Sequence, residues 1–118
     1  MKKNDIKYPV YTTVSIALSG TTSAEVDIGN RTIVGIITPS TFDGTTMTFT
    51  AAPAAGGTHY AIAASNAAST AYTVTTTASI FTPIAEGVTK GARFIKIVCG
   101  SSQTTTGTDL ILVTRNID

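Results

Sequence analysis

The side chains of this 118-residue chain that could carry out chemistry are few and scattered. The chain has one histidine, His59, and one cysteine, Cys99. A catalytic base or a metal centre needs partner groups, and no His cluster, H-E-x-x-H or C-x-x-C motif accompanies either residue. We therefore predict that His59 lies at a turn or strand end. Cys99 sits in an apolar run and can form no internal disulfide, so we expect it to pack in the core.

The acidic residues are dispersed as well. Asp27, Asp43, Glu86 and Asp109 show no spacing typical of a glycosidase pair or a calcium loop. The chain contains no G-x-S-x-G, P-loop or G-x-G-x-x-G motif. Charged residues make up 13% of the chain, compared with about 25% in ordinary soluble domains. The sequence therefore predicts no enzymatic activity, no catalytic residue, no cofactor and no metal site.

The basic residues indicate no nucleic-acid partner, because a net charge of +1 leaves no strong electrostatic footprint. Two local groups stand out along the chain: Lys2, Lys3 and Lys7, and then Lys90, Arg93 and Lys96. Such groups are usually solvated surface, and the alternative is a surface that docks onto an acidic partner. No stretch has the pattern of a signal peptide or a membrane span, so we expect no membrane partner.

The elements that must position these residues are strands. The chain contains 24 Thr, 9 Ser and 21 Ile or Val, but only 3 Leu. β-Branched residues fit pleated, half-buried surfaces and lose rotamer freedom in helices. We expect loops at 51–57, 63–71 and 100–107. Alternating apolar residues predict strands at about 14–18, 24–28, 32–38, 46–50, 60–62, 72–75, 80–81, 93–99 and 110–114.

These strands predict an all-β fold. Eight or nine short strands without an intervening helix are typical of an antiparallel sandwich or barrel. We expect a two-sheet, jelly-roll-like β-sandwich, with a small closed barrel as the alternative. Residues 33–37 and 94–98 are apolar on both faces, which favours central strands. We expect residues 1–12 to form an extended N-terminal arm and residues 13–118 to form a single domain.

Four segments carry a family resemblance: 33–39 (IVGIITP, followed by Phe42), 47–49 (MTF), 91–97 (GARFIKI) and 110–115 (LILVTR). Their order and turns resemble those of small virion proteins of tailed bacteriophages, of the capsid-decoration and head-fibre type. The resemblance spans roughly residues 26–115. One departure is that such proteins usually carry Asp-Gly-Gly before Thr-x-Tyr. Here Ala55 takes the place of the Asp, so no metal or ligand role follows for that loop.

The resemblance implies a structural protein of the virion. It would bind the major capsid protein on the outer capsid surface, as a decoration or cement protein, and form a homo-oligomer, with a trimer favoured. The N-terminal arm would lie along the capsid. The candidate contact residues are Lys2, Lys3, Lys7, Tyr8, Tyr11, Lys90 and Arg93.

A receptor- or glycan-binding module of a head fibre or tail is the alternative function. Exposed loops of a β-sandwich carry such sites readily, and the candidate loops are 51–58, 63–70 and 100–108. Sugar-binding surfaces usually present flat aromatic rings. The sequence has no Trp and few aromatic residues in these loops, which favours the decoration function.

Overall fold

The part of the chain that the structure describes consists of strands and loops, with no helix. The computed structural model describes residues 9–64, 67–85, 87–89, 91–104 and 107–116. The predicted all-β, antiparallel two-sheet sandwich is confirmed. The strands are β1 (Val10–Ile16), β2 (Val26–Asp27), β3 (Arg31–Thr38), β4 (Thr46–Ala52), β5 (Tyr60–Ala61), β6 (Ala63–Ala64), β7 (Ala67–Ala71), β8 (Thr73–Thr75), β9 (Ile80–Pro83), β10 (Phe94–Cys99) and β11 (Thr108–Asn116).

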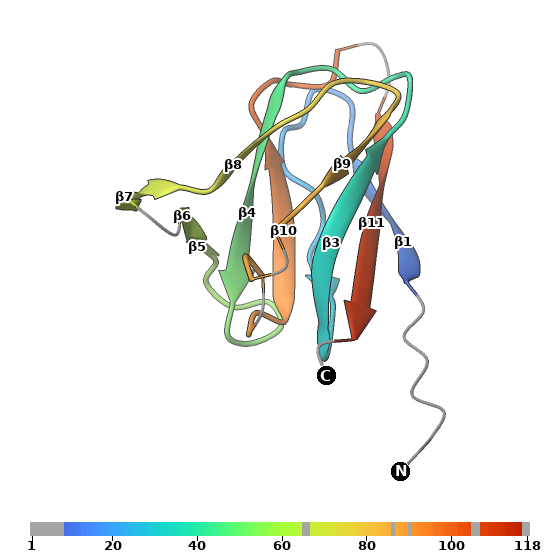
Figure 1. Cartoon of the computed structure of the whole chain (residues 1–118). Helices are drawn as coiled ribbons and strands as arrows, with labels where there is room; N and C mark the ends of the chain where they lie inside the picture. Colours follow the sequence, from blue (N-terminus) through green and yellow to red (C-terminus); the bar gives the residue numbers. More distant parts are fainter. Residues whose placement is uncertain (1–8, 65–66, 86, 90, 105–106, 117–118) are drawn as a thin grey trace.

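The strands form two facing sheets and a small hairpin (Figure 1). Sheet A has the order β1-β11-β3-β9, and sheet B has the order β2-β10-β4-β5, with β8 also paired to β4. The hairpin is β6-β7. As predicted, the apolar segments 33–37 and 94–98 lie on interior strands, β3 and β10. Because the described strands form separate sheets with free edges, they do not make the closed barrel that was the alternative.

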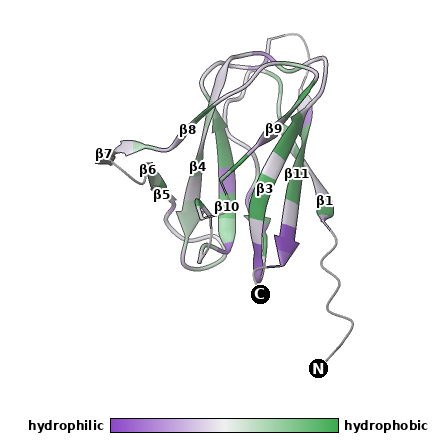
Figure 2. Cartoon of the chain, viewed as in Figure 1, coloured by the Kyte–Doolittle hydropathy of each residue, from purple (hydrophilic) through white to green (hydrophobic). Residues whose placement is uncertain are grey.

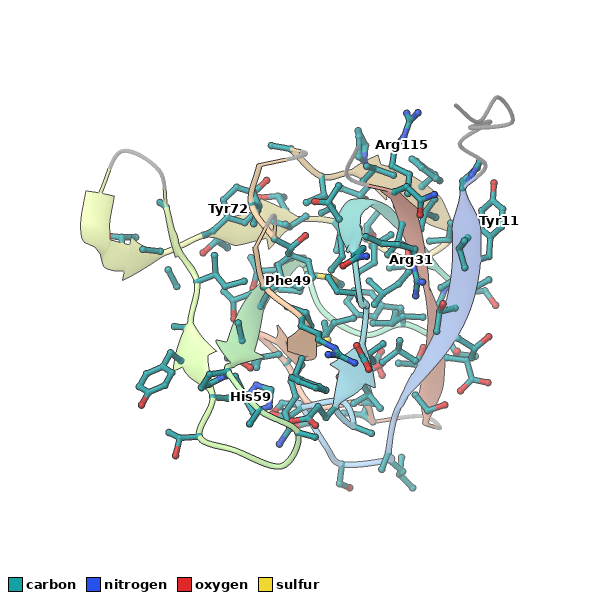
Figure 3. The ribbon with its side chains drawn as sticks, turned by 90° about the horizontal axis from the view of Figure 1, so that it is seen from below. Tyr11, Arg31, Phe49, His59, Tyr72 and Arg115 are labelled. Atoms are coloured by element: carbon teal, nitrogen blue, oxygen red, sulfur yellow. The ribbon has the colours of Figure 1, made fainter. Side chains whose placement is uncertain are left out.

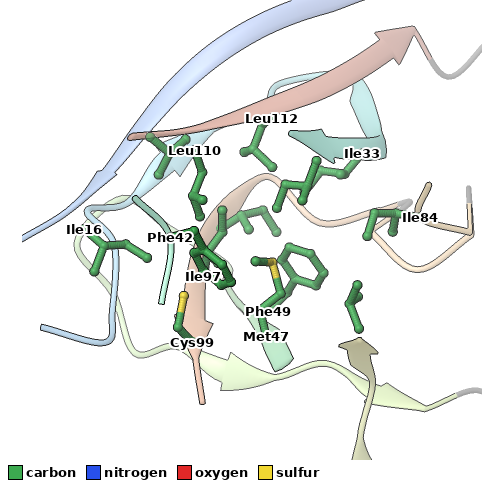
Figure 4. Packing of buried hydrophobic residues seen from close by; sticks show 14 of the residues in the cluster. Ile16, Ile33, Phe42, Met47, Phe49, Ile84, Ile97, Cys99, Leu110 and Leu112 are labelled. Atoms are coloured by element: carbon green, nitrogen blue, oxygen red, sulfur yellow. The ribbon is translucent and has the colours of Figure 1, made fainter. Parts of the chain in front are cut away.

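The core lies between the two sheets, where alternate residues of each strand meet (Figure 4). Leu110 and Leu112 face inward from sheet A, and Phe49 and Ile97 face inward from sheet B; all four are fully buried. Cys99 packs in the same cluster, as predicted. Burial raises the pKa of its thiol to about 11, because the apolar surroundings disfavour the thiolate. Figure 2 shows that β3 and β11 are hydrophobic along their middle and hydrophilic at the ends near the C-terminus.

Six threonines in the described part of the chain are buried, and several of them pair through their hydroxyls. The hydroxyls of Thr32 and Thr89 lie 3.1 Å apart, and the backbone N–H of Ile33 donates to Thr89 Oγ1 at 2.8 Å. The hydroxyls of Thr76 and Thr82 lie 2.7 Å apart. Among the described residues, every buried side-chain nitrogen or oxygen has a partner. The Thr32–Thr89 pair therefore joins segments 57 positions apart inside the sandwich without burying charge, which would cost far more.

The first strand begins earlier than the sequence predicts. β1 starts at Val10 and pairs with β11 over seven consecutive residues, so residues 10–12 of the predicted arm belong to the sandwich. Residues 1–8 of that arm lie outside the described residues. The strand ends at Ile16, and Leu18, which continues the apolar alternation, is 55% exposed. Ser19 then takes a positive φ of 69°, which turns the chain away from the sheet.

The loop predicted at 63–71 is wrong, because these residues contribute the β6-β7 hairpin. Ala and Ser are weak strand formers, and the Ser, Asn and Thr of this segment favour turns. The backbone groups of the two strands satisfy one another across the hairpin, which propensity alone does not reveal. The strand predicted at 24–28 is also shorter than expected, since only Val26–Asp27 pair with β10.

Candidate functional site

A polar cluster occupies the outer face of sheet B. We call Glu25, Thr50, Gly56 and His59 the Glu25 clasp. The His59 ring joins two parts of it: Nδ1 lies 3.0 Å from Thr50 Oγ1, and Nε2 lies 2.7 Å from Glu25 Oε1. The backbone N–H of Gly56 donates to both Glu25 carboxylate oxygens, at 3.0 and 3.3 Å. The His59 and Glu25 side chains are only 11% and 22% exposed.

The strand register brings these residues together. β10 pairs Phe94 with Asp27 of β2, and Lys96 with Thr50 of β4. Glu25 lies two residues before Asp27, so it falls in the row of Lys96 and Thr50 and faces outward with them. β5 pairs with β4 immediately after His59, so the ring lies beside the strand that carries Thr50. The turn between β4 and β5 contains Gly56 at a φ of +71°, a conformation that glycine adopts without strain.

The clasp holds the Glu25 carboxylate in its charged form. Hydrogen bonds from His59 and from the Gly56 N–H lower the pKa of Glu25 below its ordinary value, and the charge of Lys96 adds to this effect. A neutral imidazole with its proton on Nε2 satisfies both sides, since Nε2–H donates to Glu25 and Nδ1 accepts from the Thr50 hydroxyl. His59, predicted at a turn or strand end, does directly precede β5.

A hydroxyl, an imidazole and a carboxylate in this order also form the relay of a nucleophilic hydrolase. Acyl transfer needs in addition a substrate cleft at the hydroxyl and donors for an oxyanion. The two clefts described below are lined by none of Thr50, His59 and Glu25. What the clasp does is fasten the β4–β5 turn to the segment before β2, which are distant in the sequence.

A second polar contact on the same face is solvent-exposed. Arg93 donates from Nε and an Nη to the two carboxylate oxygens of Asp27, at 2.9 and 3.0 Å. The pair is open to water, with side chains 61% and 46% exposed. The Arg93 guanidinium and the N–H of Gly29 lower the pKa of Asp27. Arg93 also lies over the Phe94 ring, 5.0 Å from its centroid. This predicted contact residue is therefore already engaged within the chain.

An open cleft lies next to this pair. Its volume is about 440 Å³, and it is lined by Ala51–Pro53, Tyr60–Ile62 and Gly91–Arg93. Tyr60 is 64% exposed there, which makes it an accessible ring at the rim of an apolar hollow. A second cleft of the same volume is lined by Ala63, Tyr72, Ala85, Gly87 and Val88.

The outer face of sheet A differs, because it is largely apolar. One row across the sheet runs Tyr11, Val113 and Gly35, and the next runs Thr13, Ile111, Ile37 and Phe81. Tyr11 is 61% exposed and Phe81 is 49% exposed. The Phe81 ring lies against Gly35, where a Cβ would come within 2.5 Å of a ring carbon. We call Tyr11, Gly35, Ile37, Phe81, Ile111 and Val113 the apolar face. Ile37 and Ile111 are half-buried in it, and Gly35 and Val113 lie buried beneath it.

Residues 100–104 of the candidate loop 100–108 are closely held rather than free. Gln103 is fully buried, and its side-chain amide accepts from the Asp43 N–H and donates to the Asp43 carbonyl, both at 3.0 Å. The Asp43 carboxylate in turn accepts from the Thr104 N–H at 2.8 Å. This candidate binding loop is thus anchored to the turn before β4.

Of the predicted contact residues, the structure places two. Tyr11 lies exposed on β1, and Figure 3 shows it on the far side of the molecule from His59. Arg93 is exposed but paired with Asp27. The other predicted contact residues lie outside the described residues: Lys2, Lys3, Lys7, Tyr8 and Lys90.

Sequence reasoning missed both the Glu25 clasp and the apolar face. The clasp joins residues 34 positions apart through their side chains, and no local pattern signals it. The apolar face did leave a signal. Ile36 and Ile37 face opposite sides of β3, and Leu110 and Ile111 face opposite sides of β11. Apolar residues therefore occupy both the inward-facing and the outward-facing positions of these strands.

No protein-family model, curated protein or solved structure matches this chain. Among the described residues, no group of three or more His, Cys, Asp or Glu side chains could hold a metal ion. The described part of the chain also has no helix long and apolar enough to cross a membrane.

Proposed function

We propose that this chain is a structural virion protein of a tailed bacteriophage, which binds the outside of the capsid and stabilises the shell. The observation that carries the proposal is the apolar face. Tyr11 and Phe81 are exposed there beside Ile37 and Ile111, across three or more strands. Contiguous apolar surface of this kind marks a site where another protein binds.

The strand order supports the jelly-roll part of this proposal. Along the chain, strands alternate between the sheets from β1 to β4 and again from β8 to β11. In sheet A, the first and last strands are neighbours and β3 and β9 follow them; sheet B has the corresponding order. We propose that this is the double Greek-key arrangement of a jelly roll, an architecture used by viral capsid proteins and by lectins.

The mechanism that we propose is stabilisation by mass action. A protein that binds the assembled shell but not the separated capsid subunits favours the shell by its binding free energy. Binding through a neutral, apolar and hydroxyl-rich surface does not require charges to be desolvated, a step that offsets much of the gain in polar interfaces. The low charge content of the chain suits such a contact.

The direct test uses capsids assembled from the major capsid protein of the phage or prophage whose genome encodes this chain. We expect the protein to sediment with these particles, to appear on their outer surface by electron microscopy, and to raise the temperature at which they disassemble. Particles that disassemble at the same temperature with and without the bound protein would contradict the cementing function.

Glycan or receptor binding is the second candidate, and the cleft at Tyr60 favours it. An exposed ring beside a small apolar hollow can stack on a sugar face. A glycan array tests this function. Binding that is lost in Tyr60→Ala and retained in Tyr72→Ala would support it, whereas an array without signal would remove it.

A further inference from the structure

The two sheets have four edges, and these are not equally protected against pairing with a strand of another molecule. Natural proteins protect the backbone groups of an edge strand by shortness, charge, proline or a bulge, since a bare edge pairs with other strands. β9 has four residues and ends in Pro83. β2 has two residues, one of them Asp27. At the other edge of sheet B, β5 and β8 have two and three residues.

The remaining edge, β1, has none of these protections. Its seven residues, VYTTVSI, contain no charge and no proline. They pair with β11 in an unbroken register from Val10 to Ile16, whereas β11 and β3 shift register between Val113 and Thr114. β1 is thus long and regular. No described residue pairs with its other side (Figure 1).

We propose that β1 pairs with β1 of a second copy of this chain, antiparallel and about a two-fold axis. Pairing all seven residues places the axis at Thr13, with Val10 opposite Ile16 and Tyr11 opposite Ser15. This register keeps inward-facing residues opposite inward-facing residues, because each residue meets one of the same parity. The side chains are compatible with self-pairing, since a strand with no charge brings no like charges together across the axis.

The pairing closes at two copies. An antiparallel contact of a strand with its own copy is isologous, so it uses up the edge in both partners. The other edges are protected, and the β6-β7 hairpin has a shifted register. Sheet A becomes one eight-stranded sheet, and the two apolar faces join on the same side. The assembly is a dimer, in place of the trimer that the family resemblance implies, and it does not depend on the capsid function.

The first measurement is the mass in solution by light scattering or sedimentation. We expect twice the chain mass of 12.1 kDa for the native protein. Thr13→Lys places two like charges on the axis and should weaken the dimer by about tenfold or more, as should Thr13→Asp. Mixing the two variants should restore the dimer, as a one-to-one heterodimer. Thr75→Lys, at an exposed position of β8, is the matched control and should remain dimeric.

Amide hydrogen exchange along β1 gives a second, independent measurement. In a single copy, alternate amides of β1 face β11 and the others face water. We expect protection of consecutive amides in the native dimer, and protection of only every second amide in Thr13→Lys. The circular dichroism spectrum of Thr13→Lys checks that the variant is folded. A native monomer or trimer, or a Thr13→Lys variant that stays as dimeric as the native chain, would overturn the proposal.

Discussion

The two sheets present alike inner faces and unlike outer faces. Inside, Leu112 of sheet A and Ile97 of sheet B are equally buried. Outside, sheet B carries the Glu25 clasp and the Asp27–Arg93 pair, which are bonded within the chain. Sheet A instead exposes Tyr11 and Phe81 to solvent.

The difference shows how one architecture separates two tasks. The polar side chains of the Glu25 clasp and of the Asp27–Arg93 pair find partners in their own chain, and the clasp so holds a turn in place. Solvent cannot satisfy the exposed rings of Tyr11 and Phe81 on sheet A in this way, and burying these rings requires another molecule. We therefore expect substitutions on sheet B to change local stability, and substitutions on the outer face of sheet A to change association.

The largest effects should come from the inner faces, and they should be equal. We expect Leu112→Ala and Ile97→Ala each to lower the free energy of unfolding by about 2–5 kcal/mol, because both remove buried methylene groups and leave a cavity. Urea titration followed by circular dichroism measures this. If one variant were much less destabilised than the other, the two sheets would not share a single core.

The next effect compares two phenylalanines on opposite outer faces. Phe81→Ala should weaken binding to capsids by about tenfold or more, because it removes an exposed ring from the apolar face. Phe94→Ala is the matched control on the outer face of sheet B, and should change that binding by less than about threefold. Co-sedimentation with increasing protein concentration gives both affinities. Equal losses would assign no special role to sheet A.

A smaller effect should appear in the pH dependence of the Glu25 clasp. The pKa of Glu25 is lowered in the folded state, so its contribution is complete above the unfolded pKa of about 4.3 and is lost as pH falls through the lower folded value. Glu25→Gln should therefore lower Tm at neutral pH, and the gap to the native protein should narrow in acid. Thermal scans from neutral to acidic pH measure the gap. A gap that is constant with pH would mean that the charge of Glu25 contributes nothing.

The smallest effect should come from the exposed ion pair. Arg93→Ala should leave Tm within experimental error at moderate salt, because solvent screens the pair and holding it lowers side-chain entropy. The matched comparison is Glu25→Gln two positions away from Asp27. If Arg93→Ala lowered Tm as much as Glu25→Gln does, the exposed ion pair would stabilise the fold as much as the more buried Glu25 clasp.

Local patterns accounted for most of the fold and little of the site. The alternation at Val14 and Ile16 predicted which residues of β1 face the core, because the side-chain period of a strand is a local property. The β6-β7 hairpin escaped prediction, since its strands consist mostly of Ala, a weak strand former, and are held by mutual pairing. The partner of His59 also escaped, because Glu25 joins it only after β2, β10 and β4 are placed side by side.

By itself, the sequence determined an all-β protein with its one cysteine in the core. Residue composition and the alternation of apolar residues suffice for this, since both are properties of each strand taken separately. Only the tertiary structure decided which of the two apolar faces of β3 is covered by sheet B and which is left outside, and that β1 became an edge. These outcomes depend on strand order, which is set by contacts between segments far apart in the chain.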